Sequence, residues 1–134
     1  MTELKFFTPK SIAPTSGRFH RATIVDGKTV YLGGQVSVDM ERNTVGVGDA
    51  AAQTKQIFAN IEATLGELGG DLNNIALLTM YVVGRDSLAG VRDGKAEVLD
   101  EGRMTNEPPG TLVLVAGLSN EEWLLEVEGV AVLD

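Results

Sequence analysis

Two glutamates near the end of the chain, Glu126 and Glu128, have the residue type and spacing best suited to chemistry. They lie in the run 123–133, whose remaining side chains are mostly apolar and typical of a β-strand. Because side chains alternate between the two faces of a strand, both carboxylates share one face, about 6.6 Å apart. A carboxylate among apolar side chains is costly unless it is paired, hydrated or used. Glu126 therefore either orients a water or ligand or makes inter-subunit contacts, and for Glu128 we favour a structural role.

The sequence contains a single histidine, His20, and no cysteine. The lack of cysteine removes disulfides, thiolate zinc sites and cysteine nucleophiles. One histidine without an HExxH pattern or a paired ligand does not make a zinc site or a serine triad. A hydrogen-bonded structural role is the commoner one for such a histidine, and a direct chemical role is the alternative. We expect no metal and no other cofactor.

A pair of glycines followed by a glutamine, Gly33-Gly34-Gln35, ends the apolar run 29–32. Paired glycines let a ligand or another backbone approach closely and leave amides free to bind an oxygen. The same glycines suit a β-bulge. The two interpretations are compatible, and Gly34 and Gln35 are candidate ligand-binding residues.

Length and charge narrow the classes of function. A chain of 134 residues is expected to form one domain, 1–134. The net charge of −8 disfavours a nucleic-acid partner. No segment approaches the ~20 apolar residues of a membrane helix, and residues 1–16, interrupted by Pro9 and Pro14, do not resemble a signal peptide. The cytoplasm is the expected location.

Hydrophobic periodicity predicts an α+β fold. Two strands, 19–25 and 29–38, flank Asp26-Gly27, a pair typical of a two-residue hairpin turn. Asp49 is a suitable N-cap for a helix that ends near Leu68. The remaining elements are a buried strand at 75–83, a second helix at 87–102, and closing strands at 112–115 and 123–133. Two helices are thus expected on one face of a β-sheet of five to six strands.

The other face of this sheet is too apolar to be left in water. Leu124, Val130 and Val132 share it with the two glutamates. We expect this face to pack against another subunit, with the carboxylates at a hydrated cleft between the chains.

Together these segments resemble the RidA (YjgF) family of reactive-intermediate deaminases. The resemblance spans nearly the whole chain, and its specific parts are the Gly-Gln step and the terminal Glu-x-Glu strand. The matching segments are Tyr31-Leu32-Gly33-Gly34-Gln35-Val36, Gln53 to Leu65 with Asn60-Ile61 inside it, and Pro109 to Val132. The resemblance implies a chorismate-mutase-like fold and a homotrimer with sites in the clefts between subunits. It also implies hydrolysis of enamines or imines, such as 2-aminoacrylate, to a carbonyl compound and ammonia.

The correspondence of individual residues with the family is partial. The family's last-strand glutamate, which handles the attacking water, falls on Glu126. Its carboxylate-binding arginine falls on Gly110, its tyrosine on Phe19 and the next serine on His20. Losing the guanidinium removes a contact of about 2–3 kcal/mol, so the chain resembles a divergent branch that lacks the catalytic arginine. The substrate-binding candidates are Phe19, His20, Arg21, Gly34, Gln35, Gly110 and Thr111, and the alternative cations are Arg18, Arg21 and Arg103.

We therefore expect a trimer that binds a small metabolite between subunits, with deaminase activity that is weakened or redirected. The alternative is a non-catalytic trimer that binds a metabolite or a partner protein. The sequence leaves open whether the chain is an enzyme. An endoribonuclease activity, which some names of the family suggest, is disfavoured by the acidic charge and the lack of a nucleophile.

Overall fold

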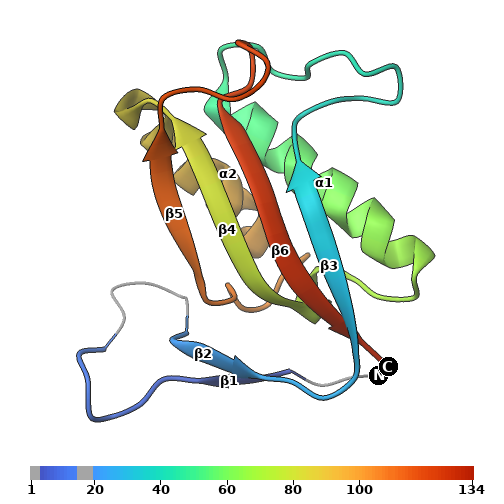
Figure 1. Cartoon of the computed structure of the whole chain (residues 1–134), viewed down its shortest axis with the longest axis vertical. Helices are drawn as coiled ribbons and strands as arrows, with labels where there is room; N and C mark the ends of the chain where they lie inside the picture. The colour runs from blue at the N-terminus through green and yellow to red at the C-terminus, as the bar shows by residue number, and fades with distance from the viewer. Residues whose placement is uncertain (1–3, 15–19) are drawn as a thin grey trace.

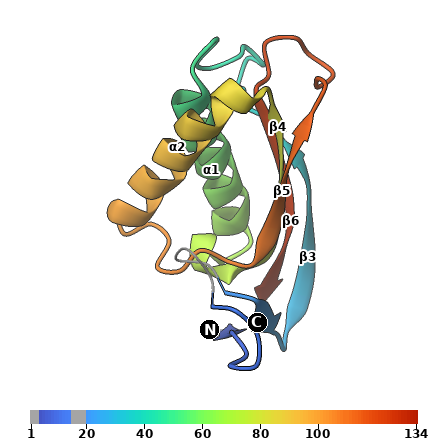
Figure 2. The ribbon, with the colours of Figure 1, turned by 90° about the vertical axis from the view of Figure 1, so that its left-hand side faces the viewer.

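The computed structural model describes residues 4–14 and 20–134. Four strands form one mixed sheet in the order β3-β6-β4-β5. Their bounds are β3 (Lys28–Gln35), β4 (Ile75–Val83), β5 (Gly110–Val115) and β6 (Leu125–Leu133). β6 is antiparallel to both β3 and β4, whereas β4 and β5 are parallel. The helices α1 (Ala50–Glu67) and α2 (Leu88–Asp100) cover one face of this sheet (Figures 1 and 2).

Smaller elements complete the fold. Two short strands, β1 (Lys5–Phe7) and β2 (Ala22–Ile24), form a separate sheet near the end of the molecule where β6 finishes (Figure 1). Single 3-10 turns, η1 (Leu72–Asn74) and η2 (Arg85–Ser87), flank β4. The structure confirms the predicted α+β fold with two helices on one face. No helix within the described residues has the length and hydrophobicity needed to cross a membrane.

The hairpin predicted between residues 19–25 and 29–38 is wrong. β2 pairs with β1, with Phe6 opposite Thr23, and β3 pairs with β6. β3 can bury its apolar side chains on the helix side only when it lies beside β6, and that burial outweighs the local turn signal of Asp26-Gly27. β1 has only three residues, too few for the periodicity of its sequence to reveal it.

The helices follow the sequence closely. The Asp49 carboxylate accepts a hydrogen bond of 3.0 Å from the backbone N–H of Ala52 and so caps α1. Ile57, Ile61 and Leu65 of α1 are fully buried. Gly94 of α2 allows a close approach to α1, because a Cβ there would lie 2.9 Å from the carbonyl oxygen of Ala51.

The two faces of the sheet differ sharply. Side chains of β4 and β6 that point toward the helices are buried: Leu78, Met80, Val82, Leu125, Val127 and Ala131. On the opposite face Tyr31 is 82% exposed, and Leu77 and Val113 are also exposed. The predicted alternation along β6 is confirmed from Leu125 to Glu128, but Leu124 packs against the core and Val132 is 1% exposed, so neither lies on the open surface as predicted. The rest of the outer face is apolar and uncovered in the single chain.

Gln53 fixes the segment that leads into β6. Its side chain is completely buried. The amide nitrogen donates to the carbonyl oxygens of Gly46 (3.0 Å) and Glu122 (2.9 Å), and the amide oxygen accepts from the backbone N–H of Leu124 (2.9 Å). Because Glu122 and Leu124 directly precede β6, Gln53 positions the start of the strand that carries Glu126.

Replacing Gln53 with methionine should destabilise the protein. The substitution keeps the side-chain length but leaves buried backbone groups without partners, at a cost of about 1–3 kcal/mol in the free energy of unfolding. Urea denaturation measures this change. Gln56→Met is the matched control, because the Gln56 amide donates to Asn60 one turn away and to no other described residue, and its loss should cost about 0.2–0.5 kcal/mol. Equal costs for the two variants would contradict the role of Gln53.

Candidate functional site

Glu126 lies near the start of β6 on the outer face of the sheet. It pairs in register with Tyr81 of β4, and its side chain is half-buried. Among the described residues it forms no hydrogen bond and no ion pair. A half-buried carboxylate without a partner is available to a water molecule or a ligand.

Gly34 makes room for this carboxylate. The register between β3 and β6 shifts between Leu32 and Gln35, which is the β-bulge that the paired glycines favour. A Cβ on Gly34 would overlap the Oε2 atom of Glu126, whereas a Cβ on Gly33 would meet nothing within 4 Å. The structure therefore brings together two of the predicted site residues, Gly34 and Glu126.

Glu128 is held differently from Glu126. The Tyr81 hydroxyl donates a hydrogen bond of 2.5 Å to Oε1 of Glu128. This hydrogen bond, together with some loss of hydration and the negative charges of Glu128 and Glu126, raises the pKa of Tyr81 above its ordinary 10.0. Tyr81 consequently remains a hydrogen-bond donor at neutral pH and fixes Glu128, while Glu126 remains unpaired. Tyr81 was not among the residues predicted for the site. The available signal was the alternation of side chains along the strand 75–83, which places Tyr81 on the same face as Thr79.

Gln35 and Thr111 lie on the periphery of this arrangement. The Gln35 amide donates to the carbonyl oxygen of Gly33 (3.0 Å), so its side chain folds back over the bulge. Thr111 pairs with Thr79, which in turn pairs with Glu128. Thr111 therefore shares the outer face with the carboxylates but is two strands away from Glu128, about 10 Å.

Gly110 occupies a position where the backbone excludes a side chain. It pairs with Leu78 at the start of β5, and a Cβ there would overlap the Leu78 carbonyl oxygen. No larger residue fits without a shift of the strand. The missing arginine is therefore accompanied by a local backbone path that could not carry one.

His20 and Arg21 lie at the far end of the sheet from Glu126. The His20 ring stacks on Phe6 with the ring centres 5.0 Å apart, and the Arg21 guanidinium donates to the carbonyl oxygen of Ala13 (2.9 Å). The hydroxyl of Thr23 in β2 donates to the carbonyl oxygen of Ala76 (2.8 Å), so this region attaches to the beginning of β4. Tyr81, opposite Glu126, lies five residues further along β4, about 16 Å away.

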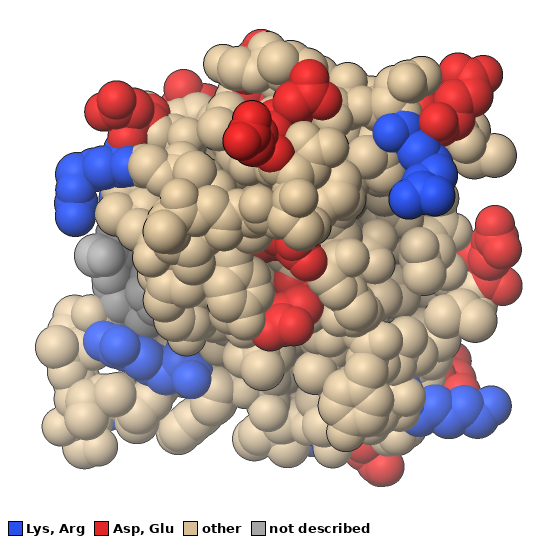
Figure 3. Space-filling model, turned by 45° about the horizontal axis from the view of Figure 1, so that its top comes forward, with Lys and Arg blue, Asp and Glu red and all other residues tan. Residues whose placement is uncertain are grey.

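Of the alternative cations, the two within the described residues, Arg21 and Arg103, do not reach Glu126 in the same chain. Arg103 forms ion pairs of 3.1 Å with Glu62 and with Glu101, and its hydrogen bond to Glu62 is the main reason that its pKa is raised. Arg18 and Phe19 lie outside the described residues. Figure 3 shows acidic surface within a largely uncharged face and basic side chains toward the edges of the view. In residues 4–14 and 20–134, no cluster of three or more His, Asp or Glu side chains is arranged to hold a metal ion.

Two helices on one face of a mixed sheet, with carboxylates on an open apolar face, define a two-layer α+β protein. The sequence matches the model of the Endoribonuclease L-PSP family over residues 10–133, and the chain belongs to this family, which includes the RidA (YjgF) proteins. The resemblance seen in the sequence is thereby confirmed. The assignment to a branch without the arginine stays a prediction.

Individual relatives support this assignment. The chain is 30% identical to a RutC family protein of Pyrococcus abyssi over 131 residues, which cover 98% of both proteins. Its fold matches the crystal structure of the Rid family protein YyfB from Yersinia pestis with a TM-score of 0.82, at 27% identity over 98% of this chain and 99% of the other. It also matches Escherichia coli TdcF with bound serine, with a TM-score of 0.71 over 95% of this chain and 94% of TdcF. That identity is 23%, so the likeness concerns the fold alone.

The contact between Gly34 and Glu126 can be tested with two alanine substitutions. Gly34→Ala should displace the Glu126 carboxylate, because the new Cβ would occupy the place of Oε2. Gly33→Ala, the matched control on the same bulge, meets open space and should leave the carboxylate in position. Crystal structures of both variants measure the displacement. An unmoved Glu126 in Gly34→Ala would show that the backbone adapts instead.

Proposed function

We propose that the chain forms one RidA-like domain, residues 1–134, that assembles as a homotrimer and binds a small metabolite in the clefts between subunits. In these clefts Glu126 would assist the hydrolysis of an imine or enamine to a carbonyl compound and ammonia. The observation that carries the proposal is the state of Glu126: half-buried, unpaired, and held against Gly34 on an uncovered apolar face. Family membership supports the same chemistry.

The proposed reaction needs one well-placed carboxylate. Glu126 accepts a proton from water while the water oxygen bonds to the imine carbon, and it returns this proton to the nitrogen, which gives a neutral carbinolamine. Transfer of the carbinolamine hydroxyl proton to the nitrogen through the same carboxylate then breaks the C–N bond, forms the carbonyl group and releases ammonia. A positioned carboxylate contributes about 10²–10⁴-fold to such a proton transfer. Backbone groups of the Gly33–Gly34 bulge and the Gln35 side chain would bind polar atoms of the substrate.

The charge distribution favours a substrate without a carboxylate. Within the described residues no Lys or Arg pairs with Glu126, Gly110 carries no side chain, and the chain has a net charge of −8. An anionic imino acid would therefore meet an unfavourable field and find no bidentate partner.

Assembly would complete the site. His20 and Arg21 belong to the region at the far end of the sheet from Glu126, so they could contribute to a cleft only across a subunit boundary. The exposed side chains of Tyr31, Leu77 and Val113 supply the apolar surface that such packing needs. In a trimer His20 and Arg21 of one chain would lie near the Glu126 of a neighbouring chain.

The trimer can be tested by sedimentation equilibrium. The wild-type protein should have the mass of three 14.2 kDa chains. Val113→Lys places a charge on the outer face and should shift the population to single chains. Val47→Lys, an exposed valine in the loop before α1, is the matched control and should leave the mass unchanged. A wild-type protein of one-chain mass would refute the assembly.

The role of Glu126 can be tested with imines generated in situ. An amine oxidase produces an uncharged imine and an amino-acid oxidase produces an imino acid, and competition with semicarbazide measures the hydrolysis rate. Glu126→Gln should lower the rate at which the protein hydrolyses the uncharged imine by at least tens of times, because the proton acceptor is lost. Glu128→Gln is the matched control, since Glu128 is occupied by Tyr81 and its amide can still accept that hydrogen bond.

Three outcomes would change the proposal. An unchanged rate in Glu126→Gln would remove Glu126 from the mechanism. Faster turnover of the imino acid than of the uncharged imine would refute the preference for a substrate without a carboxylate. Metabolite binding without any turnover would favour a non-catalytic binding trimer, an alternative that the missing cation supports.

A further inference from the structure

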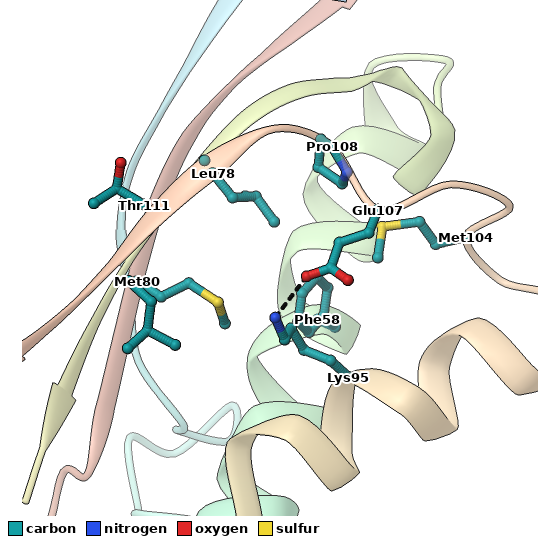
Figure 4. Close-up of a pocket in the computed structure, with 10 residues that line it drawn as sticks. Phe58, Leu78, Met80, Lys95, Met104, Glu107, Pro108 and Thr111 are labelled. Atoms are coloured by element: carbon teal, nitrogen blue, oxygen red, sulfur yellow. Dashed lines mark hydrogen bonds and ion pairs between the residues drawn. The ribbon is translucent and has the colours of Figure 1, made fainter. Parts of the chain in front are cut away.

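A cavity of about 240 Å³ opens on the helix-covered side of the sheet, on the opposite face from Glu126. It lies between the two helices, strands β4 and β5, and the segment that joins α2 to β5 (Figure 4). Its walls are mainly apolar. The lining residues that matter here are Phe58, Leu78, Met80, Met104, Pro108 and Leu112.

The cavity is open because of two features of β5. This strand forms the edge of the sheet, so no further strand covers its outer side. Gly110 lines the cavity but adds no side chain to fill it. Leu112, the next residue on the same side of β5, stays 36% exposed at the rim.

An ion pair provides the charged groups of the cavity. Nζ of Lys95 in α2 lies 2.6 Å from Oε1 of Glu107 in the segment before β5. A dashed line marks this ion pair in Figure 4. The side chains are only 17% and 21% exposed. A ligand with a carboxylate could pair with Lys95 only by displacing Glu107, which would leave the largely buried Glu107 carboxylate unpaired. A ligand with an ammonium group could pair with Glu107 only by displacing Lys95, which would leave the Lys95 ammonium unpaired. Either exchange is costly because an unpaired charge in such surroundings is poorly solvated.

We propose that this cavity binds a small uncharged molecule with an apolar body of about one ring and a hydrogen-bonding group directed at Lys95 and Glu107. An apolar cavity of about 150 Å³ accommodates benzene, so this volume has room for a ring and one polar substituent. The ion pair selects for neutral ligands, because it offers both a donor and an acceptor while its charges cancel. Gly110 and Thr111, which the family resemblance places among the substrate-binding candidates, also line this cavity, but binding there does not depend on the proposed chemistry at Glu126.

Three ligands of the same shape and different charge test the selection. Benzamide should bind to the wild-type protein with a Kd of about 1 mM, a weak affinity suited to so few atoms. Benzoate and benzylammonium should bind at least tenfold more weakly. Titrations followed by NMR give the affinities and show whether signals of Met80 and Met104 respond. Equal affinity for all three ligands, or shifts that avoid both methionines, would overturn the proposal.

Removing one charge should reverse this preference. Glu107→Gln leaves Lys95 without its carboxylate, so the affinity for benzoate should rise at least tenfold relative to that for benzamide. Glu97→Gln is the matched control, since it removes an acidic charge from α2, the helix that carries Lys95, at the exposed Lys55–Glu97 pair. The same rank order in Glu107→Gln as in the wild type would refute the role of the ion pair.

Closing the mouth of the cavity tests its location. Leu112→Trp places an indole at the rim and should abolish benzamide binding. Leu114→Trp is the control, because Leu114 lies on the same strand and the same side, is similarly exposed at 39%, and does not line the cavity. Thermal unfolding and circular dichroism establish that both variants fold. Loss of binding in Leu114→Trp alone, or in neither variant, would contradict the assignment.

Discussion

The alternation of side chains along β6 is the constraint on which the rest of the structure depends. One set of residues, with Leu125 and Val127 among them, is buried beneath the helices at the centre of the sheet. The period of two then forces Glu126 and Glu128 onto the opposite face. A shift of one residue in the register would bury both carboxylates in the core at a prohibitive cost, so the fold and the position of the carboxylates are determined together. The buried Gln53 contributes to this by holding the backbone just before the strand.

Partners, rather than positions alone, distinguish the two carboxylates. Both lie on one face and are two residues apart, but the Tyr81 hydroxyl donates a hydrogen bond to Glu128, whereas Glu126 has no hydrogen-bond or ion-pair partner in the part of the chain that the structure describes. The bulge at Gly34 then fits against the free carboxylate. A charge that is left half-buried and unpaired reduces the stability of a single chain. Such a cost is acceptable where hydration, a ligand or a neighbouring subunit compensates for it.

The sequence predicted the elements whose periodicity is long and regular. The N-cap at Asp49, the strand 75–83 and the outward direction of Glu126 all follow from local patterns that tertiary packing reinforces. The pairing of β2 with β1 did not follow, because three-residue strands carry too little periodic signal and partner choice is a long-range effect. The Tyr81–Glu128 hydrogen bond and the Lys95–Glu107 ion pair also join residues far apart in the chain or on different elements, where spacing gives no information.

Gly110 affects both the proposed substrate preference and the cavity on the helix side. Its backbone lies so close to Leu78 that a side chain is excluded, which removes the cation expected from the family resemblance. The same lack of a side chain leaves a cavity on the helix side, where Lys95 lines the wall and is already paired with Glu107. In our proposals both features disfavour anionic ligands. The close approach of the β4 and β5 backbones at Gly110 thus underlies both the proposed preference for substrates without a carboxylate and the largely apolar cavity on the helix side.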